Sequence, residues 1–189
     1  MKTLILNGSP RKNGDTAALL AVLKAELTGE VVELSAYRDK IAPCVDCRHC
    51  YTHAECAIVD DMQTVYADDY DNLIVASPVY YGTLTGPLLS LVSRLQIHHT
   101  AKHMRGVPNV LRSKLGALIL TGGGKGNPDG AKKNARAVLR ILNAELGDSA
   151  LNESGDGVFA ASLNTDEVAA CDDVAALSAV RAIARRMNT

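Results

Sequence analysis

The chain has 189 residues, of which 47% are hydrophobic and 22% are charged, so it has the size and composition of a globular domain with one substantial core. With a formal net charge of −1, the chain has no excess of positive charge with which to bind a nucleic acid. No apolar run approaches the roughly 20 residues of a membrane helix, and Leu4 to Leu6 is too short for a signal peptide. We therefore expect a cytoplasmic protein that binds neither nucleic acid nor membrane.

Segments typical of strands and of helices alternate along the chain. Strands are expected, in chain order, at residues 2–7, 30–34, 72–77, 115–120 and 158–161. Helices are expected at residues 15–28, 84–96, 128–146 and 166–187, the last capped by Asn164. Because the strands are apolar throughout and helices separate them, they predict a doubly wound parallel sheet covered on both faces.

A polar loop between the first expected strand and helix carries the strongest signal. Its backbone N–H groups and hydroxyls, together with the start of the helix, predict a phosphate-binding concavity. The loop lacks the glycine patterns of the triphosphate and dinucleotide cradles, which favours a single terminal phosphate. The alternative is a turn in which glycine and proline only serve geometry. The loop reads Gly8-Ser9-Pro10-Arg11-Lys12-Asn13-Gly14-Asp15-Thr16.

Two further loops follow the third and fourth expected strands, at residues 78–86 and at Thr121-Gly122-Gly123-Gly124. Carboxyl ends of parallel strands meet at one edge of a sheet, where ligands bind in this architecture. Glycines allow close approach of the backbone to a planar ligand, and Tyr80 and Tyr81 offer rings that stack on one. The alternative for both tyrosines is that they fill the rim of the sheet.

Taken together, the three loops resemble those of the flavodoxin-like NAD(P)H-dependent FMN reductase superfamily. The resemblance covers about the first 125 residues and departs at residues 88–91, where members often carry Lys-x-Phe. It implies an α/β fold with a five-stranded parallel sheet in the order 2-1-3-4-5. The matching residues are Gly8-Ser9-Pro10-Arg11-x-Asn13-Gly14-x-Thr16, Ser77-Pro78-Val79-Tyr80-Tyr81-Gly82-Thr83-x-Thr85-Gly86-Pro87 and Thr121-Gly122-Gly123.

The resemblance implies FMN as cofactor and NAD(P)H as electron donor. It places the FMN phosphate on Ser9, Arg11, Asn13, Gly14, Asp15 and Thr16. It places the flavin ring against Pro78, Val79, Tyr80, Tyr81, Gly82 and Thr83, with Thr121, Gly122 and Gly123 nearby. The implied reaction reduces a flavin, a quinone or a similar acceptor, and because the flavin carries the chemistry we expect no catalytic side-chain acid or base. The implied assembly is a homodimer or homotetramer, and a ferredoxin is an alternative electron donor.

Four cysteines, Cys44, Cys47, Cys50 and Cys56, form a C-x₂-C-x₂-C-x₅-C run within an expected insertion at residues 36–70 of a single domain at 1–189. In a cytoplasmic chain such a run is not a disulfide framework. The first three cysteines resemble the run that binds a [4Fe–4S] cluster in bacterial ferredoxins. The iron–sulfur flavoprotein branch of the superfamily carries its cluster at this place. A thiol loop without metal and a zinc site are the alternatives.

The segment 98–112 contains three histidines, His98, His99 and His103, and several basic residues. We consider three roles for it: contact with the phosphate of a nicotinamide cofactor, contact with a neighbouring subunit, and a solvated basic loop. For the whole chain, the main hypothesis is an FMN oxidoreductase, with electron transfer through a [4Fe–4S] cluster as an extension. The rival hypothesis is a sensor that binds a phosphate ligand or nucleotide on the same fold without turnover.

Overall fold

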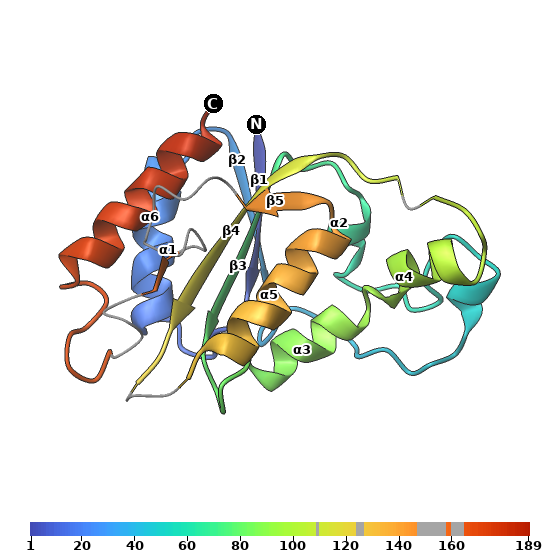
Figure 1. The fold of residues 1–189 in the computed structure, drawn as a ribbon, viewed down its shortest axis with the longest axis horizontal. Coiled ribbons are helices and arrows are strands. Elements are labelled where there is room, and N and C mark those ends of the chain that lie inside the picture. Colours follow the sequence, from blue (N-terminus) through green and yellow to red (C-terminus); the bar gives the residue numbers. More distant parts are fainter. Residues whose placement is uncertain (109, 124–126, 147–157, 160–164) are drawn as a thin grey trace.

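The computed structural model describes residues 1–108, 110–123, 127–146, 158–159 and 165–189 (Figure 1). Within these ranges, none of the helices is both long and apolar enough to cross a membrane. The elements are β1 (Lys2–Asn7), α1 (Asp15–Glu26), β2 (Glu30–Ser35), η1 (His49–Tyr51), α2 (Gln63–Tyr66), β3 (Asn72–Pro78), α3 (Gly86–Ser93), α4 (Gln96–His103), β4 (Lys114–Thr121), α5 (Asp129–Ile141), β5 (Ala144–Leu146), β6 (Val158–Phe159) and α6 (Val174–Met187).

The strands form a parallel sheet in the order β2-β1-β3-β4-β5. Strand β6 pairs with the carboxyl half of β4, at Ile119 and Leu120, whereas β5 pairs with its first residues. The order 2-1-3-4-5 is that of flavodoxin-like proteins, so the predicted fold class is confirmed. The chain reverses direction across the sheet between β1 and β3, which makes this pair the switch point.

Helices cover both faces of the sheet, with α1 and α6 on one face and α3 and α5 on the other (Figure 1). The side chains of β1 alternate between the two faces: Leu4 and Leu6 pack toward α3 and α5, and Ile5 packs toward α1 and α6. Every residue of β3 is buried, as expected for a central strand of a doubly covered sheet. The apolar strand sequences therefore specify the two cores directly.

The predicted helix at 128–146 is too long, because α5 ends at Ile141 and residues 144–146 form β5. Asn143 adopts a left-handed conformation with φ +55°, which ends the helix, and its carbonyl accepts a hydrogen bond of 3.1 Å from the Lys114 N–H. The open edge of β4 then pairs with the three residues that follow. Sheet pairing overrides helix propensity at this point.

The other predicted helices also change at their ends. The helix predicted at 84–96 starts later and ends at Ser93, and a second short helix, α4, follows it. The helix predicted at 166–187 begins only at Val174, because the Asp173 carboxylate accepts a hydrogen bond of 2.9 Å from the Ala176 N–H and caps it. The predicted cap Asn164 and the predicted strand residues 160–161 lie outside the described part of the chain.

The cap at Asp173 is testable by substitution. We expect Asp173→Ala to lower the free energy of unfolding by about 1 kcal/mol, the usual cost of an N-cap. The matched control is Asp172→Ala, because Asp172 is exposed and its side chain lies outside the helix. Urea unfolding followed by circular dichroism measures both variants. An equal loss for the two would show that Asp173 does not act as the cap.

Candidate functional site

Three loops meet at the carboxyl edge of the sheet, after β1, β3 and β4. The Gly8 N–H continues the pairing of β1 with β3 by donating to the Ala76 carbonyl at 2.8 Å. The Val79 N–H donates to the Thr121 carbonyl at 2.6 Å, and this bond joins the second loop to the third. The structure thus brings together the three loops that the sequence predicts at one rim.

The amino-terminal end of α1 is open toward this rim. Gly14 stands at the N-cap position, and in the described chain no side chain caps the helix. The first N–H groups of the helix therefore remain available for an anion. Beside them Thr16 is 2% exposed, and its hydroxyl lies 2.8 Å from the hydroxyl of Thr121. Ser9 is also buried, and its N–H donates to Asn7 Oδ1 at 2.7 Å.

The charged residues of the first loop lie in different environments. A Cβ at Gly14 would lie 3.2 Å from Arg11 Nε, so the Arg11 side chain folds back over the start of α1. Lys12 and Asn13 are exposed. The Asp15 carboxylate accepts a hydrogen bond of 3.0 Å from the Ala170 N–H, so it ties the helix start to the segment before α6. What Asp15 offers to a ligand at the rim is its backbone N–H.

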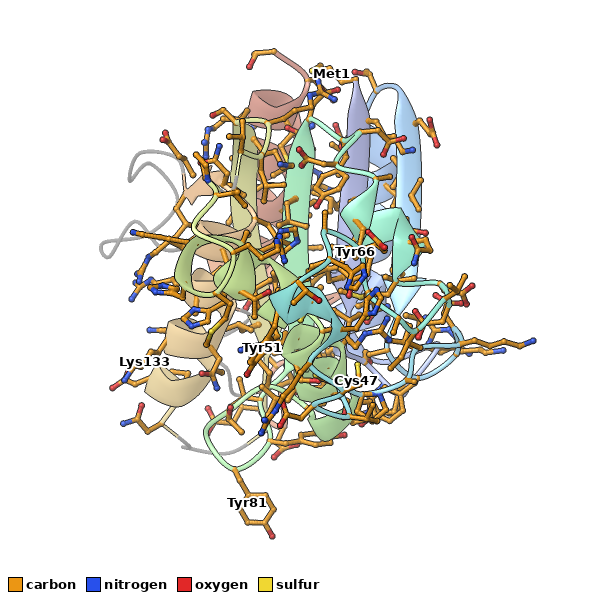
Figure 2. All side chains as sticks on the ribbon, turned by 90° about the vertical axis from the view of Figure 1, so that its right-hand side faces the viewer. Met1, Cys47, Tyr51, Tyr66, Tyr81 and Lys133 are labelled. Carbon is orange, nitrogen blue, oxygen red and sulfur yellow. The ribbon has the colours of Figure 1, made fainter. Side chains whose placement is uncertain are left out.

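The second loop is a tight turn that presents a tyrosine to solvent. Tyr80 and Thr83 exchange two backbone hydrogen bonds, of 2.9 and 3.0 Å. Between them Tyr81 and Gly82 have φ values of +50° and +72°, the pattern of a type I′ turn. The Tyr81 ring is fully exposed and extends away from the body of the protein (Figure 2). The alternative in which both tyrosines fill the rim is therefore wrong for Tyr81.

Helix α5 holds this turn in place through hydrogen bonds. The Ala131 N–H donates to the Gly82 carbonyl at 2.7 Å, and the Asn134 side-chain amide donates to the Thr83 hydroxyl at 2.7 Å. The approach is so close that a Cβ at Gly130 would lie 2.5 Å from the Gly82 carbonyl oxygen. The turn is consequently held by a rigid helix, although its central residues are exposed or half-buried.

The third loop, at Thr121–Gly123, is covered by a segment that the sequence analysis did not connect with it. The Thr165 N–H and hydroxyl both donate to the Gly122 carbonyl, at 2.6 and 2.9 Å. A Cβ at Gly123 would lie 2.6 Å from Asp166 Oδ2. Asp166 thus brings a carboxylate to the rim from more than 40 residues downstream, where no local sequence signal marks it. Gly124 lies outside the described residues.

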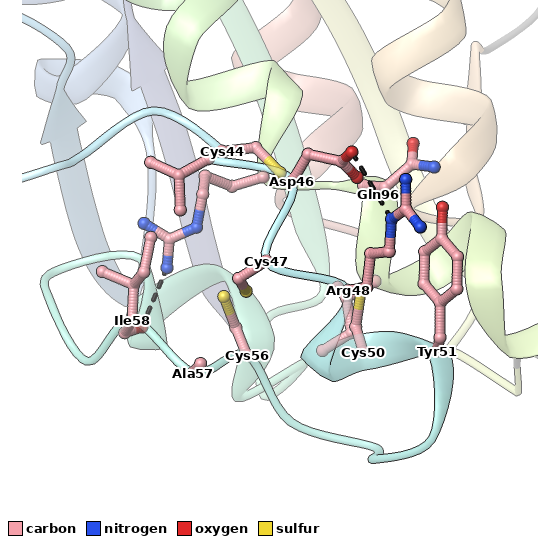
Figure 3. Close-up of a pocket in the computed structure, with 13 residues that line it drawn as sticks. Cys44, Asp46, Cys47, Arg48, Cys50, Tyr51, Cys56, Ala57, Ile58 and Gln96 are labelled. Atoms are coloured by element: carbon pink, nitrogen blue, oxygen red, sulfur yellow. Dashed lines mark hydrogen bonds and ion pairs between the residues drawn. The ribbon is translucent and has the colours of Figure 1, made fainter.

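The four cysteines line one pocket (Figure 3). The thiols of Cys47 and Cys56 point toward each other, although the two residues lie on separate stretches of the loop (Figure 3). Asp46 and Arg48, on either side of Cys47, have left-handed φ values of +50° and +59°. These two left-handed residues turn the backbone sharply on both sides of Cys47, at a conformational cost.

The cysteine loop is anchored by side chains from α3 and α4. The Cys44 N–H donates to Ser93 Oγ at 3.0 Å. Arg105, which follows α4, donates from Nη1 to the carbonyls of Cys50 and His53. Figure 1 shows η1 and α4 side by side, beyond the end of α3. Arg105 therefore supports the cysteine loop, and contact of its segment with a nicotinamide cofactor or a neighbouring subunit stays a prediction.

Arg94 is a fully buried arginine at the end of α3 that lines the same pocket. Its Nη1 donates to Asp60 Oδ2 at 2.7 Å and to the Ala42 carbonyl at 2.9 Å, and its Nη2 donates to the Ile58 carbonyl at 2.9 Å. Burial alone raises the pKa of Asp60, but the bonds from Arg94 and from two backbone N–H groups outweigh it and lower this pKa. Asp60 is thus the charged partner of Arg94 at neutral pH.

The four cysteines can supply the donor set of either metal centre that the sequence predicts. Zinc takes four ligands at one point, at about 2.3 Å for sulfur, and a four-iron cluster takes one thiolate on each iron. Among the residues that the structure describes, no three His, Cys, Asp or Glu side chains are grouped for a single metal ion. The cluster, the zinc site and the thiol loop without metal all stay predictions.

Helix α3 connects the two sites. It begins at Gly86, directly after the second loop, and ends at Ser93, which binds the cysteine loop. Eight helical residues at about 1.5 Å each span roughly 12 Å. At the start of the helix, the Thr85 hydroxyl donates to the Gly8 carbonyl at 2.8 Å, so both rim loops share this support. The sequence did not show the roles of Arg94 and Arg105, because the loop residues that they bind lie more than 30 residues away in the chain.

The fold and the rim loops define the chain as a flavodoxin-like α/β protein. It is similar to the FMN-dependent NADH-azoreductase of Bacillus anthracis in complex with FMN, with a TM-score of 0.61 and 12% identity over 100% of both chains. It is also similar to a WrbA-like flavodoxin of Agrobacterium tumefaciens, with a TM-score of 0.57 and 11% identity over 98% of both chains. At these identities the similarity concerns the fold.

Residues 1–152 match the family described as NADPH-dependent FMN reductase, and the chain belongs to this family. It is similar to an iron–sulfur flavoprotein of Methanocaldococcus jannaschii, with 37% identity over 128 residues, which cover 65% of this chain and 62% of that protein. An iron–sulfur flavoprotein of Archaeoglobus fulgidus is 30% identical over 173 residues, which cover 82% of this chain and 76% of that protein. The match thus spans less than two thirds of the first relative's length. The predicted family resemblance is confirmed.

The support of the second loop by α5 can be tested with a matched pair of glycines. We expect Gly130→Ala to lower the free energy of unfolding by about 1–3 kcal/mol, because its methyl group would overlap the Gly82 carbonyl. Gly86→Ala is the control, since it also lies in the first turn of a helix and no described atom lies within 4 Å of its Cβ position. Urea denaturation compares the two, and equal stabilities would contradict the close packing.

Proposed function

We propose that the protein is an FMN-binding oxidoreductase that takes electrons from NAD(P)H and passes them to a small acceptor such as a flavin or a quinone. The observation that carries the proposal is the uncapped start of α1 beside the buried hydroxyls of Thr16 and Thr121. An open helix terminus flanked by buried hydroxyls suits a phosphate, and it lies at the switch point where this fold places its ligands. The family membership agrees with FMN as that ligand.

In this proposal the FMN phosphate lies on the first loop. Each hydroxyl has one proton and two acceptor positions, so when Thr121 donates to Thr16, the Thr16 proton is available to a phosphate oxygen. The N–H groups at the start of α1 supply further donors, and Arg11 adds a positive charge over Gly14. The contributing residues are Ser9, Arg11, Asn13, Gly14, Asp15 and Thr16.

The second and third loops would orient the flavin ring. FMN, when bound, supplies the hydride chemistry, and the surrounding residues hold it in place. The backbone of the Tyr80–Thr83 turn is fixed by α5, so its exposed groups are pre-positioned. The exposed Tyr81 ring leaves a flat, solvent-open surface at which a donor or an acceptor can approach. The contributing residues are Pro78, Val79, Tyr80, Tyr81, Gly82 and Thr83, with Thr121, Gly122 and Gly123.

We propose further that Cys44, Cys47, Cys50 and Cys56 hold a [4Fe–4S] cluster. All four line one pocket, and relatives with 30% identity or more carry the name iron–sulfur flavoprotein. The cluster, when bound, would supply a one-electron centre. Helix α3, with a length of roughly 12 Å, would then set the separation between the flavin loop and the cluster loop.

The visible spectrum distinguishes this proposal from a phosphate-ligand sensor. Protein purified without oxygen should be yellow with FMN alone and brown with FMN and cluster together. Addition of NADPH or NADH should bleach the flavin absorbance. A colourless protein that fails to bind added FMN would overturn the proposal, and a protein that binds FMN but is never reduced would favour the sensor.

The phosphate assignment predicts the effect of one substitution. We expect Thr16→Val to weaken FMN binding by about 1–3 kcal/mol, because a phosphate oxygen loses its donor. The control is Thr28→Val, which removes a hydroxyl beyond the opposite end of α1. Quenching of flavin fluorescence during titration measures both dissociation constants. An unchanged constant for Thr16→Val would place the phosphate elsewhere.

The cluster assignment predicts a second effect. We expect Cys47→Ser to lose the iron and acid-labile sulfide while it keeps FMN, because one of four thiolate ligands is removed. Cys171→Ser is the control, since Cys171 is exposed and lies outside the pocket. Iron and sulfide analysis together with the FMN content of each variant decides. Loss of FMN with retention of iron would contradict the assignment.

A further inference from the structure

Arg94 makes three of the five hydrogen bonds that its guanidinium can make, and Nε is its one nitrogen without a partner among the described residues. Nη1 and Nη2 are tied to Asp60 and to the carbonyls of Ala42 and Ile58. Nε is buried, and it has no hydrogen-bond partner among the described residues. A buried donor without a partner is destabilising, and more so when it is charged. Such a donor beside a pocket of thiols points to an acceptor that belongs in the pocket.

Cys56 is the cysteine of this pocket that interacts with Arg94. Its thiol interacts with the Arg94 guanidinium and also with the Tyr66 hydroxyl. The Tyr66 hydroxyl in turn donates to the Arg94 backbone carbonyl at 3.0 Å. A neutral thiol is a weak acceptor, whereas a thiolate bound to iron is a negatively charged one. The environment of Cys56 is therefore suited to a charged sulfur.

We propose that Arg94 is a positioning residue of the cysteine site, which donates its Nε–H to the Cys56 sulfur and stabilises the reduced state of the bound cluster. The inference rests on the proposed function, since it requires a cluster on the four cysteines. Reduction adds negative charge, and a hydrogen bond to a cluster sulfur raises the reduction potential. Arg94 would exert this effect from the carboxyl-terminal end of α3, whereas the second loop precedes the amino-terminal end of the helix.

The residue type fits this role. Arginine stays protonated at every pH at which the protein folds, and its planar fork holds all donors in fixed directions. With Nη1 and Nη2 fixed by three acceptors, the direction of Nε–H is fixed as well. A lysine at this position would keep the charge and the contact with Asp60, but it would have no donor at the position of Nε.

The test is an anaerobic redox titration of the holoprotein, followed by electron paramagnetic resonance of the reduced cluster. We expect the cluster of Arg94→Lys to be about tenfold harder to reduce, which is about 59 mV for one electron. The matched control is Arg181→Lys, because Arg181 forms an ion pair with Glu26 and lies outside the cysteine pocket. Its potential should equal that of the wild type.

The outcomes separate the inference from the proposed function. Wild-type protein without iron and sulfide would overturn the cluster and the inference together. A full cluster in Arg94→Lys with the wild-type potential would overturn the inference alone, as would an equal shift in Arg181→Lys.

A second measurement covers the case in which Arg94→Lys does not fold or does not retain its cluster. Protein labelled with ¹⁵N-arginine is prepared in an Arg48→Lys background, because Arg48 also lines the pocket. Pulsed electron paramagnetic resonance should detect a hyperfine coupling between an arginine nitrogen and the reduced cluster. Absence of this coupling would overturn the inference.

Discussion

The parallel pairing of β1 with β3 is the constraint on which the rest of the structure depends. Because β1 lies between β2 and β3, the helices that follow β1 and β3 leave the sheet on opposite faces. The loops that precede α1 and α3 must then diverge, and the space between them is the rim site. The open start of α1, the Tyr80–Thr83 turn and the hydroxyl pair of Thr16 and Thr121 all occupy this edge.

Helix α3 links the rim loops, which the pairing of β1 with β3 positions, to the cysteine loop. Its start is bound to the first loop through Thr85, and its end holds the cysteine segment through Ser93 and Arg94. The segment between β2 and β3 has little regular structure of its own, so buried side-chain donors replace the backbone ladder that would otherwise fix it. A charge buried at this point is costly unless it is fully paired, which ties the geometry of Arg94 to that of Asp60 and of the pocket.

Three of the five described non-glycine residues with a positive φ lie at the two sites. Asp46 and Arg48 in the cysteine loop, and Tyr81 at the tip of the second loop, all adopt left-handed conformations that side chains other than glycine rarely take. Each is held by contacts from a helix: the loop by the donors of α3 and by Arg105, and the turn by α5. These contacts thus stabilise the strained loops that present the functional groups.

The sequence by itself determined the apolar strands, the three rim loops and the cysteine run, because apolar runs, glycine-rich breaks and short-range spacings are local properties of the chain. The strand order followed only from the family resemblance. The sequence pattern placed α5 and α6 wrongly at their ends, since Asn143 and Asp173 act as boundaries only in the presence of the β4 edge and of the fold around them. The tertiary structure alone decided that Arg94, Arg105 and Asp166 belong to the sites. Their partners are 34 to 55 residues away in sequence, and the periodicity of the sequence does not show which buried donor binds which acceptor.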